Sequence, residues 1–171
     1  MQLPAELQSI AELRQLAQTA DHIDVKVVEG NNTFREFIAG LMNFSPGWIK
    51  ALYRVRWAFV RVLGMKQNGI PKSPGMRPEN VPMQSGEKAA FFKVDYAQPD
   101  HFWIVSAKEA HLTAYLGVVM QPLQGGKRRF HVITIVKYHR WTGPVYFNLI
   151  RPFHHLVVNS MARAALRYQA S

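Results

Sequence analysis

Cysteine is absent from this chain of 171 residues. That single absence excludes disulfide scaffolds, thiol nucleophiles, Fe–S clusters and zinc ribbons. Long apolar runs are missing too, since no stretch approaches the roughly 18 residues that a membrane-spanning helix needs. The segment 1–20 contains Glu6, Glu12 and Arg14 and has no continuous apolar core. We therefore expect no signal peptide and a cytoplasmic protein.

Sequence motifs that carry known chemistry are also missing. There is no Gly-x-Ser-x-Gly turn for a nucleophilic serine and no glycine-rich turn for phosphates. The seven histidines include no pair at i, i+4 beside a carboxylate, so the sequence predicts neither a metal site nor a cofactor. The carboxylates of Asp21, Asp24, Asp95 and Asp100 are expected to lie in solvent. These absences weigh against an enzyme without deciding the question.

Apolar residues, in contrast, are plentiful. The chain is 48% hydrophobic and contains ten Phe, four Trp and six Tyr. A chain of this length buries roughly 70% of the surface that it exposes when unfolded, so we expect residues 1–171 to form one domain. Lys and Arg number 21 against 11 acidic residues, which gives a net charge of +10. Because these charges are scattered along the chain, an ordinary basic surface is preferred over a dedicated polyanion site.

The first half of the chain alternates helical and extended patterns. Apolar residues at helical spacing predict a helix over 5–17, and strict alternation predicts a strand over 21–28. Thr33 can cap a second helix, and Pro46 opens a third, amphipathic helix over 46–63. The segment 64–88 is rich in Pro and Gly and shows no period, which predicts either a lid or a linker.

Four strands are expected next, over 89–96, 102–107, 111–120 and 129–138. Their connections are short, so neighbouring strands should be antiparallel and form a meander. Alternate residues of the last strand are the cleaner apolar set and are expected to point inward: Val132, Thr134, Val136 and Tyr138.

A long helix is expected to close the chain from Gly143 onward. Its apolar residues recur at helical spacing, which predicts a core-facing stripe made of Val145, Leu149, Phe153, Leu156, Val157, Met161, Ala164 and Tyr168. Pro152 removes one helical hydrogen bond and clashes with the preceding turn, so a kink or a break is expected there.

This order of elements resembles the helix-grip fold of START-like and birch-pollen-allergen-like proteins. In that fold a strand and two short helices precede a curved antiparallel sheet, and a long C-terminal helix lies across the sheet. Closer still, the chain resembles an uncharacterised bacterial family, domain-of-unknown-function family 2867, in Asp21-His22-Ile23-Asp24 and in three C-terminal patterns: Gly143-x-x-Tyr146, Ile150-x-Pro152-Phe153-His154 and Leu156-Val157-Val158. The resemblance implies an α+β, helix-grip fold with a cavity. It implies no reaction.

A cavity between the curved sheet and the C-terminal helix would suit a small ligand, since concave, mostly apolar sites are where small molecules usually bind. We expect a small, largely apolar molecule beneath the segment 64–88. The residues expected to line the site are Phe92, Tyr115, Tyr138, Tyr146, Phe153 and His154.

His154 follows the proline and has two interpretations. In the preferred one it is hydrogen-bonded locally, to the backbone that Pro152 frees. In the other it is the polar anchor of the ligand site, or an acid or base. The second interpretation allows an enzyme of polyketide-cyclase type, in which His154 or a tyrosine transfers a proton.

Surface binding provides the remaining alternatives. The basic residues 127–129, together with aromatic residues on strands, could bind nucleic acid. The basic, aromatic-rich helix over 46–63 could lie on an anionic membrane, although packing in the core is the preferred interpretation. The sequence leaves a homodimer open.

Overall fold

The computed structural model describes residues 3–49, 51–52, 61 and 75–168. Most of the helix predicted over 46–63, and residues 64–74 of the predicted lid, lie outside the described residues. The helical elements are η1 (Ala5–Leu7), α1 (Ala11–Gln18), α2 (Phe34–Asn43), η2 (Pro78–Asn80), η3 (Gln124–Gly126) and α4 (Thr142–Ala165). The strands are β1 (His22–Gly30), β2 (Lys88–Ala89), β3 (Phe92–Gln98), β4 (Phe102–Lys108), β5 (Leu112–Pro122) and β6 (Arg128–Tyr138).

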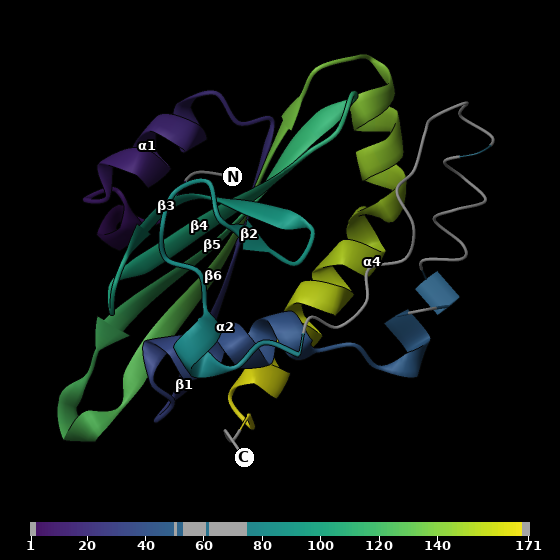
Figure 1. Cartoon of the computed structure of the whole chain (residues 1–171). Helices are drawn as coiled ribbons and strands as arrows, with labels where there is room; N and C mark the ends of the chain where they lie inside the picture. The colour runs from purple at the N-terminus through teal and green to yellow at the C-terminus, as the bar shows by residue number, and fades with distance from the viewer. Residues whose placement is uncertain (1–2, 50, 53–60, 62–74, 169–171) are drawn as a thin grey trace.

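The six strands form one antiparallel sheet in the order β1-β6-β5-β4-β3-β2. Strands β3 to β6 are the predicted meander. Strand β1 joins them from far away in the sequence, with His22 opposite Val136 and Gly30 opposite Arg128. With its curved sheet, short helices and long C-terminal helix, the fold is α+β and consistent with the predicted helix grip (Figure 1).

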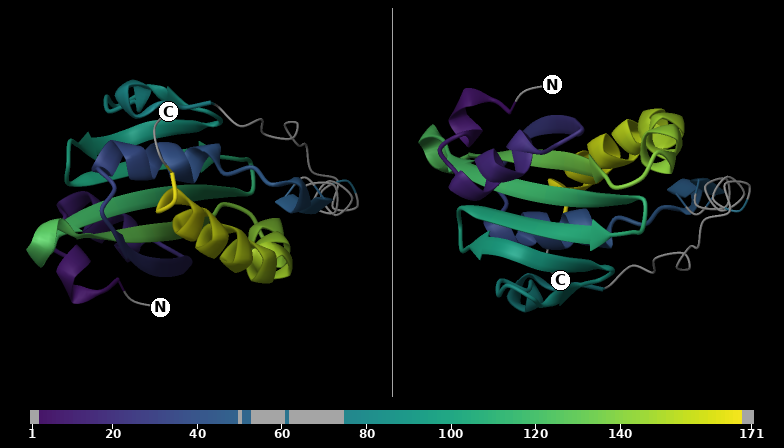
Figure 2. Two further views of the ribbon diagram at one scale, coloured as in Figure 1. Left: turned by 90° about the horizontal axis from the view of Figure 1, so that it is seen from below. Right: turned by 90° about the horizontal axis from the view of Figure 1, so that it is seen from above.

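Helices cover both faces of this sheet. Figure 2 shows α2 and α4 on one face and α1 on the other. The residues Phe130–Val136 of β6 are therefore all buried. Val132 packs towards α2 and α4, whereas Ile133 and Ile135 pack beneath α1. The prediction of a single inward face on β6 was wrong, because the N-terminal helix covers the second face.

Helix α2 begins with a reciprocal hydrogen-bond pair. The Glu36 backbone N–H donates to Thr33 Oγ1 at 3.3 Å, and the Thr33 backbone N–H donates to Glu36 Oε2 at 2.7 Å. The buried face of the helix places Phe37 parallel to Phe130, with ring centroids 4.0 Å apart. Gly40 allows a close approach to α4, since a Cβ there would lie 3.0 Å from the Ala165 Cα. The Thr33 cap was predicted correctly.

Helix α4 continues through Pro152 but changes direction along its length (Figures 1 and 2). A proline is the usual cause of such a bend. The predicted stripe along the helix was wrong for its first four members, since Val145, Leu149, Phe153 and Leu156 are exposed. The buried residues of α4 are Gly143, Tyr146, Phe147, Val158, Ala162 and Ala165. Both sides of the helix are apolar, so periodicity could not choose between them.

Residues 75–88, the described end of the predicted lid, are held by hydrogen bonds to α2 and β4. Asn43 both donates to the Met76 carbonyl and accepts from the Met76 N–H, each at 2.7 Å. Trp103 Nε1 donates to the Pro82 carbonyl at 2.8 Å. Residues 75–88 therefore pack against α2 and β4. In the described part of the chain, no helix is long and apolar enough to cross a membrane.

Candidate functional site

A depression of about 470 Å³ opens between the edge strand β1 and helix α4. The sheet contributes one wall and the C-terminal helix the other. The depression thus lies between the two elements where the sequence places its cavity, but at the sheet edge. It is lined by His22, Ile23, Asp24, Arg151, Pro152 and His155.

The centre of this site is the carboxylate of Asp24, which is only 5% exposed. Its Oδ1 accepts a hydrogen bond from Lys26 Nζ at 3.0 Å. Its Oδ2 lies 3.1 Å from His155 Nδ1, the distance of an ion pair. The sequence prediction that Asp24 lies in solvent was wrong, because α4 crosses directly over this part of β1.

Neighbouring charges keep Asp24 ionised. Burial disfavours the charged carboxylate, but the hydrogen bond and charge of Lys26, with the charge of His155, outweigh it, so the pKa of Asp24 lies below its ordinary value. The pKa of His22 is also lowered, first by burial and then by His155 and Arg151, against the attraction of Asp24. At neutral pH the site therefore holds a carboxylate beside a neutral His22.

The rings around the site are closely packed. The centroid of His22 lies 4.8 Å from that of Phe147 and 5.9 Å from that of His155. His154 lies on the other side of Phe147, at 5.9 Å. Burial, followed by the charges of His155, His22 and Lys26, lowers the pKa of His154 to about 4 against the opposing effect of Asp24. His154 does not line the depression.

An aspartate beside a histidine can orient the ring and balance its charge when the ring takes up a proton. Here Asp24 holds His155 by one ring nitrogen, and His155 lines the depression. The arrangement suits recognition of a polar group, or proton transfer to it. Across the described residues, no group of three or more His, Asp or Glu side chains is placed to hold a metal ion.

The structure does not bring the six predicted site residues into one cavity. Tyr138 and Tyr146 lie together in a small apolar cluster with Phe147. Tyr115 packs on the opposite face, under α1. The remaining three lie apart from one another: Phe92 beside Phe91 near the sheet edge, Phe153 exposed on α4, and His154 beside Phe147.

His22, Asp24, Arg151 and His155 were not among the predicted site residues. A signal for two of them was present, because His22 and Asp24 alternate along a strand and so share one face. No comparable signal in the sequence marked Arg151 and His155, which lie on α4. His154 and His155 are adjacent and point about 100° apart, and only the packing of α4 decides which one meets Asp24.

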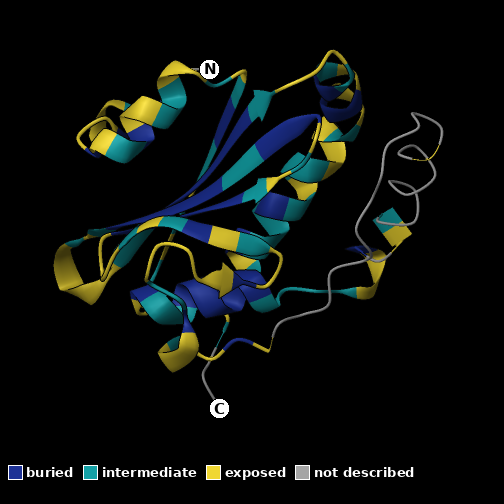
Figure 3. Ribbon diagram, turned by 45° about the horizontal axis from the view of Figure 1, so that its top comes forward, coloured by how far each residue is buried: buried dark blue, intermediate teal, exposed yellow. Residues whose placement is uncertain are grey.

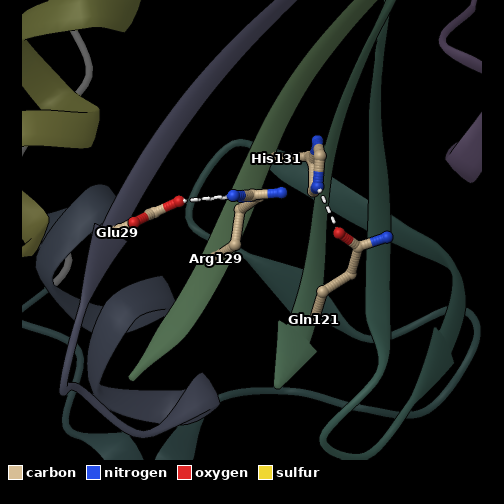
Figure 4. Close-up of polar contacts among 4 residues, drawn as sticks. All are labelled: Glu29, Gln121, Arg129 and His131. Carbon is tan, nitrogen blue, oxygen red and sulfur yellow. Dashed lines mark hydrogen bonds and ion pairs between the residues drawn. The ribbon is translucent and has the colours of Figure 1, made fainter. Parts of the chain in front are cut away.

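A second polar cluster lies on the α1 face of the sheet (Figure 4). His131 is 1% exposed, and its Nε2 lies 3.0 Å from Gln121 Oε1. Burial lowers the pKa of His131. Beside it, Arg129 donates twice to Glu29 Oε1, at 2.9 and 2.7 Å. These residues line neither the depression between β1 and α4 nor a second one beside α2, so we interpret the cluster as structural.

The other depression, of about 530 Å³, lies beside α2, η2 and β2. Its most prominent cation, Arg35, already donates to the carbonyl oxygens of Pro78 and Val81. The residues lining it include no buried carboxylate and no histidine. The depression between β1 and α4 is therefore the stronger candidate.

Comparison with protein families identifies this chain. The model of a family of proteins of unknown function, DUF2867, matches residues 16–161. The chain belongs to this family, as the sequence patterns predicted. No curated protein matches it.

Three solved structures are similar to the chain at low identity. Mll3558 from Rhizobium loti has a TM-score of 0.45 and 8% identity, over 85% of this chain and 95% of that one. MLL2253 from Mesorhizobium loti has a TM-score of 0.41 and 12% identity, over 85% and 99%. The hypothetical protein jhp0584 from Helicobacter pylori has a TM-score of 0.42 and 12% identity, over 97% and 94%.

Proposed function

We propose that this chain binds a small molecule with an apolar body and an anionic group in the depression between β1 and α4. The observation that carries the proposal is the lining of the depression. Pro152 supplies apolar surface, and Arg151 supplies a permanent positive charge at the exposed rim. The only carboxylate in the lining, Asp24, is already paired with Lys26 and His155.

An anionic group entering the depression would meet Arg151, with His22 and His155 as hydrogen-bond partners. The negative charge of Asp24 would repel this group less than an unpaired carboxylate would, because Lys26 donates a hydrogen bond to one carboxylate oxygen and His155 lies against the other. A small ligand of this size also fits the volume, since typical small-molecule sites measure about 300–1,000 Å³.

Octanoate is a suitable probe, because it joins a carboxylate to a short apolar chain. We expect it to shift the NMR signals of the His22 and His155 rings, and octanol to shift them much less. Arg151→Gln should weaken octanoate binding by about tenfold, since a hydrogen bond to a charged group contributes about 1.5–3 kcal/mol. Arg163→Gln removes the same charge from an exposed position three turns along α4 and should leave octanoate binding unchanged.

Two results would contradict this proposal. One is the absence of any shift at His22 or His155 with millimolar octanoate. The other is an equal loss of affinity in Arg151→Gln and Arg163→Gln, which would indicate nonspecific attraction to a basic surface. Native mass spectrometry of freshly purified protein adds an independent measurement, because a retained small molecule would appear as a mass shift that denaturation removes.

A second candidate function is acid–base catalysis of the polyketide-cyclase type, and the contact of Asp24 Oδ2 with His155 Nδ1 is the observation that favours it. The proton-transfer group would then be His155, because His154 does not line the depression. Asp24→Asn with an unchanged melting temperature should remove turnover while leaving octanoate binding within about twofold. Turnover that depends instead on Tyr138 or Tyr146 would contradict this assignment.

The same proposal would connect the family with START-like proteins, whose helix-grip fold also encloses a ligand cavity. We do not extend it to nucleic acid. Of the three basic residues at the β5–β6 hairpin, Arg128 donates to the carbonyls of Asn31 and Asn32, and Arg129 is paired with Glu29.

A further inference from the structure

The outer face of helix α4 carries an exposed apolar stripe. Its members are between 40% and 77% exposed, and they follow one another at intervals of three or four residues: Trp141, Val145, Leu149, Phe153 and Leu156. Residues at these intervals share one side of a helix, and the span from first to last measures about 22 Å along the axis. Figure 3 shows exposed residues recurring along the visible side of α4, next to its buried turns.

Single exposed apolar residues are normal on a protein surface, whereas a continuous patch usually marks an interaction site. This stripe is continuous over four helical turns. The sequence pattern assigned all its members except Trp141 to the core, but the structure buries the opposite side of the helix against the sheet. The stripe therefore has no partner among the described residues that would explain its composition.

The charges that α4 itself carries have a single sign. Helix α4 contains Arg151 and Arg163 and no acidic residue. The same holds for the whole C-terminal part of the chain, since Glu109 is the last acidic residue in the sequence. Lys137 and Arg140 precede the helix, and Arg167 follows it. The net positive charge of the chain is thus concentrated after β4.

These charges discriminate between the surfaces that could cover the stripe. A second copy of the chain docked through the same face would place α4 against α4, with basic residues on both sides and no acidic residue on either helix to pair with them. An anionic bilayer complements both properties at once. Its acyl boundary accepts the apolar side chains, and its head groups attract Lys and Arg.

We propose that the outer face of α4 binds peripherally to an anionic membrane surface. The helix would lie in the plane of the interface, with Leu149, Phe153 and Leu156 inserted at the head-group boundary. Trp141 suits the same boundary, because its indole combines an apolar body with an N–H donor. All residues of the stripe are among those that the structure describes. The proposal is separate from the membrane alternative that the sequence raised for residues 46–63. It is also independent of ligand binding in the depression.

Vesicle co-sedimentation tests this directly, with vesicles of phosphatidylcholine alone and vesicles containing one quarter phosphatidylglycerol. We expect binding to the anionic vesicles, weaker binding to the neutral ones, and a loss of binding as salt rises. Leu149→Asp and Leu156→Asp should each weaken binding by at least about tenfold, because each replaces an apolar side chain that would insert into the membrane with a negative charge that the anionic lipid repels. Arg163→Gln should weaken it by about fivefold, the contribution of one basic residue near an anionic surface.

Phe91→Asp is the matched control. Phe91 is 52% exposed, close to the 53% of Leu156. It lies beside β3, near one edge of the sheet, whereas α4 contacts β1 and β6 at the other edge. It receives the same new charge, and its binding to anionic vesicles should fall by no more than the factor that one charge contributes.

Five results would overturn the proposal. The first three are the absence of vesicle binding, equal binding to neutral and anionic vesicles, and equal losses in Leu149→Asp and Phe91→Asp. The fourth is a dimer, measured by analytical ultracentrifugation, that Leu149→Asp dissociates while vesicles remain unbound, because a second copy would then cover the stripe. The melting temperature of Leu149→Asp provides the fifth result. If Leu149→Asp lowers the melting temperature as a core substitution would, the stripe is buried within the folded chain, and the proposal is again wrong.

Discussion

The buried imidazole of His154 should make the stability of this fold depend on pH in a defined way. Burial lowers its pKa to about 4 in the folded chain. In the unfolded chain the ring is hydrated and should titrate near 6.5. Between these two values the unfolded chain binds a proton that the folded chain does not. Stability is therefore highest above pH 6.5 and is lost as the pH falls towards 4.

The size of this loss follows from the two pKa values. Between pH 7.5 and pH 5.5, linkage for a single group with these values removes about 1.3 kcal/mol from the free energy of unfolding. Taking about 2 kcal/mol per molar urea as the slope for a chain of this size, the midpoint should fall by about 0.6 M. These pH values lie above the range in which most carboxylates titrate, so the change reports mainly on histidines.

Urea unfolding of the wild-type chain and of His154→Gln, each at pH 7.5 and pH 5.5, isolates the effect. The glutamine is neutral at both pH values and keeps a polar group at the site. Its midpoint should fall by about 0.6 M less than that of wild type over this interval. His101→Gln, at an exposed position, should behave as wild type does. Equal losses in wild type and His154→Gln would refute the reasoning, since His154 would then titrate alike in both states.

Three further predictions concern stability, measured as the free energy of unfolding in urea at neutral pH. Thr33→Ala removes the side-chain acceptor that caps α2 and should cost about 1 kcal/mol, while Thr33→Ser should cost much less. Gly40→Ala forces a methyl group against α4 and should cost about 1–3 kcal/mol, whereas Gly47→Ala, which meets nothing within 4 Å, should be neutral or slightly stabilising. Trp103→Phe leaves the Pro82 carbonyl without its donor and should cost about 1–3 kcal/mol, and an unchanged midpoint would mean that residues 75–88 are not held by this bond.

Sequence patterns predicted the strands of the sheet well, because strands and tight turns depend on residues that are close together in the sequence. Strict alternation defined β1, and short turns ordered the meander, so the antiparallel direction of neighbouring strands in the meander followed from nearby residues. The cap at Thr33 was equally local, since its partner Glu36 lies in the same turn. What the sequence could not supply was the position of the N-terminal helix. The burial of Ile133 and Ile135 depends on α1, which is far from β6 in the chain.

The predicted site residues lie in different parts of the structure for a related reason. Aromatic residues such as Tyr115 and Tyr146 fit a cavity wall by composition, but the structure places them on opposite faces of the sheet. Composition cannot distinguish an aromatic residue that lines a cavity from one that fills a core. Asp24 was misjudged because its burial depends on α4, whose path over β1 no local pattern specifies.

The site between β1 and α4 is therefore a product of helix packing. Small residues decide how α4 is rotated about its axis: a Cβ on Gly143 would lie 2.7 Å from the His111 carbonyl oxygen, and a Cβ on Gly40 would meet the backbone of Ala165. A helix displaced by one residue turns about 100°, which would aim His154 instead of His155 at Asp24 and turn the exposed apolar stripe towards an edge of the sheet. The close contacts at Gly40 and Gly143 thus fix two properties together, namely which histidine pairs with the buried carboxylate and which side of α4 remains exposed.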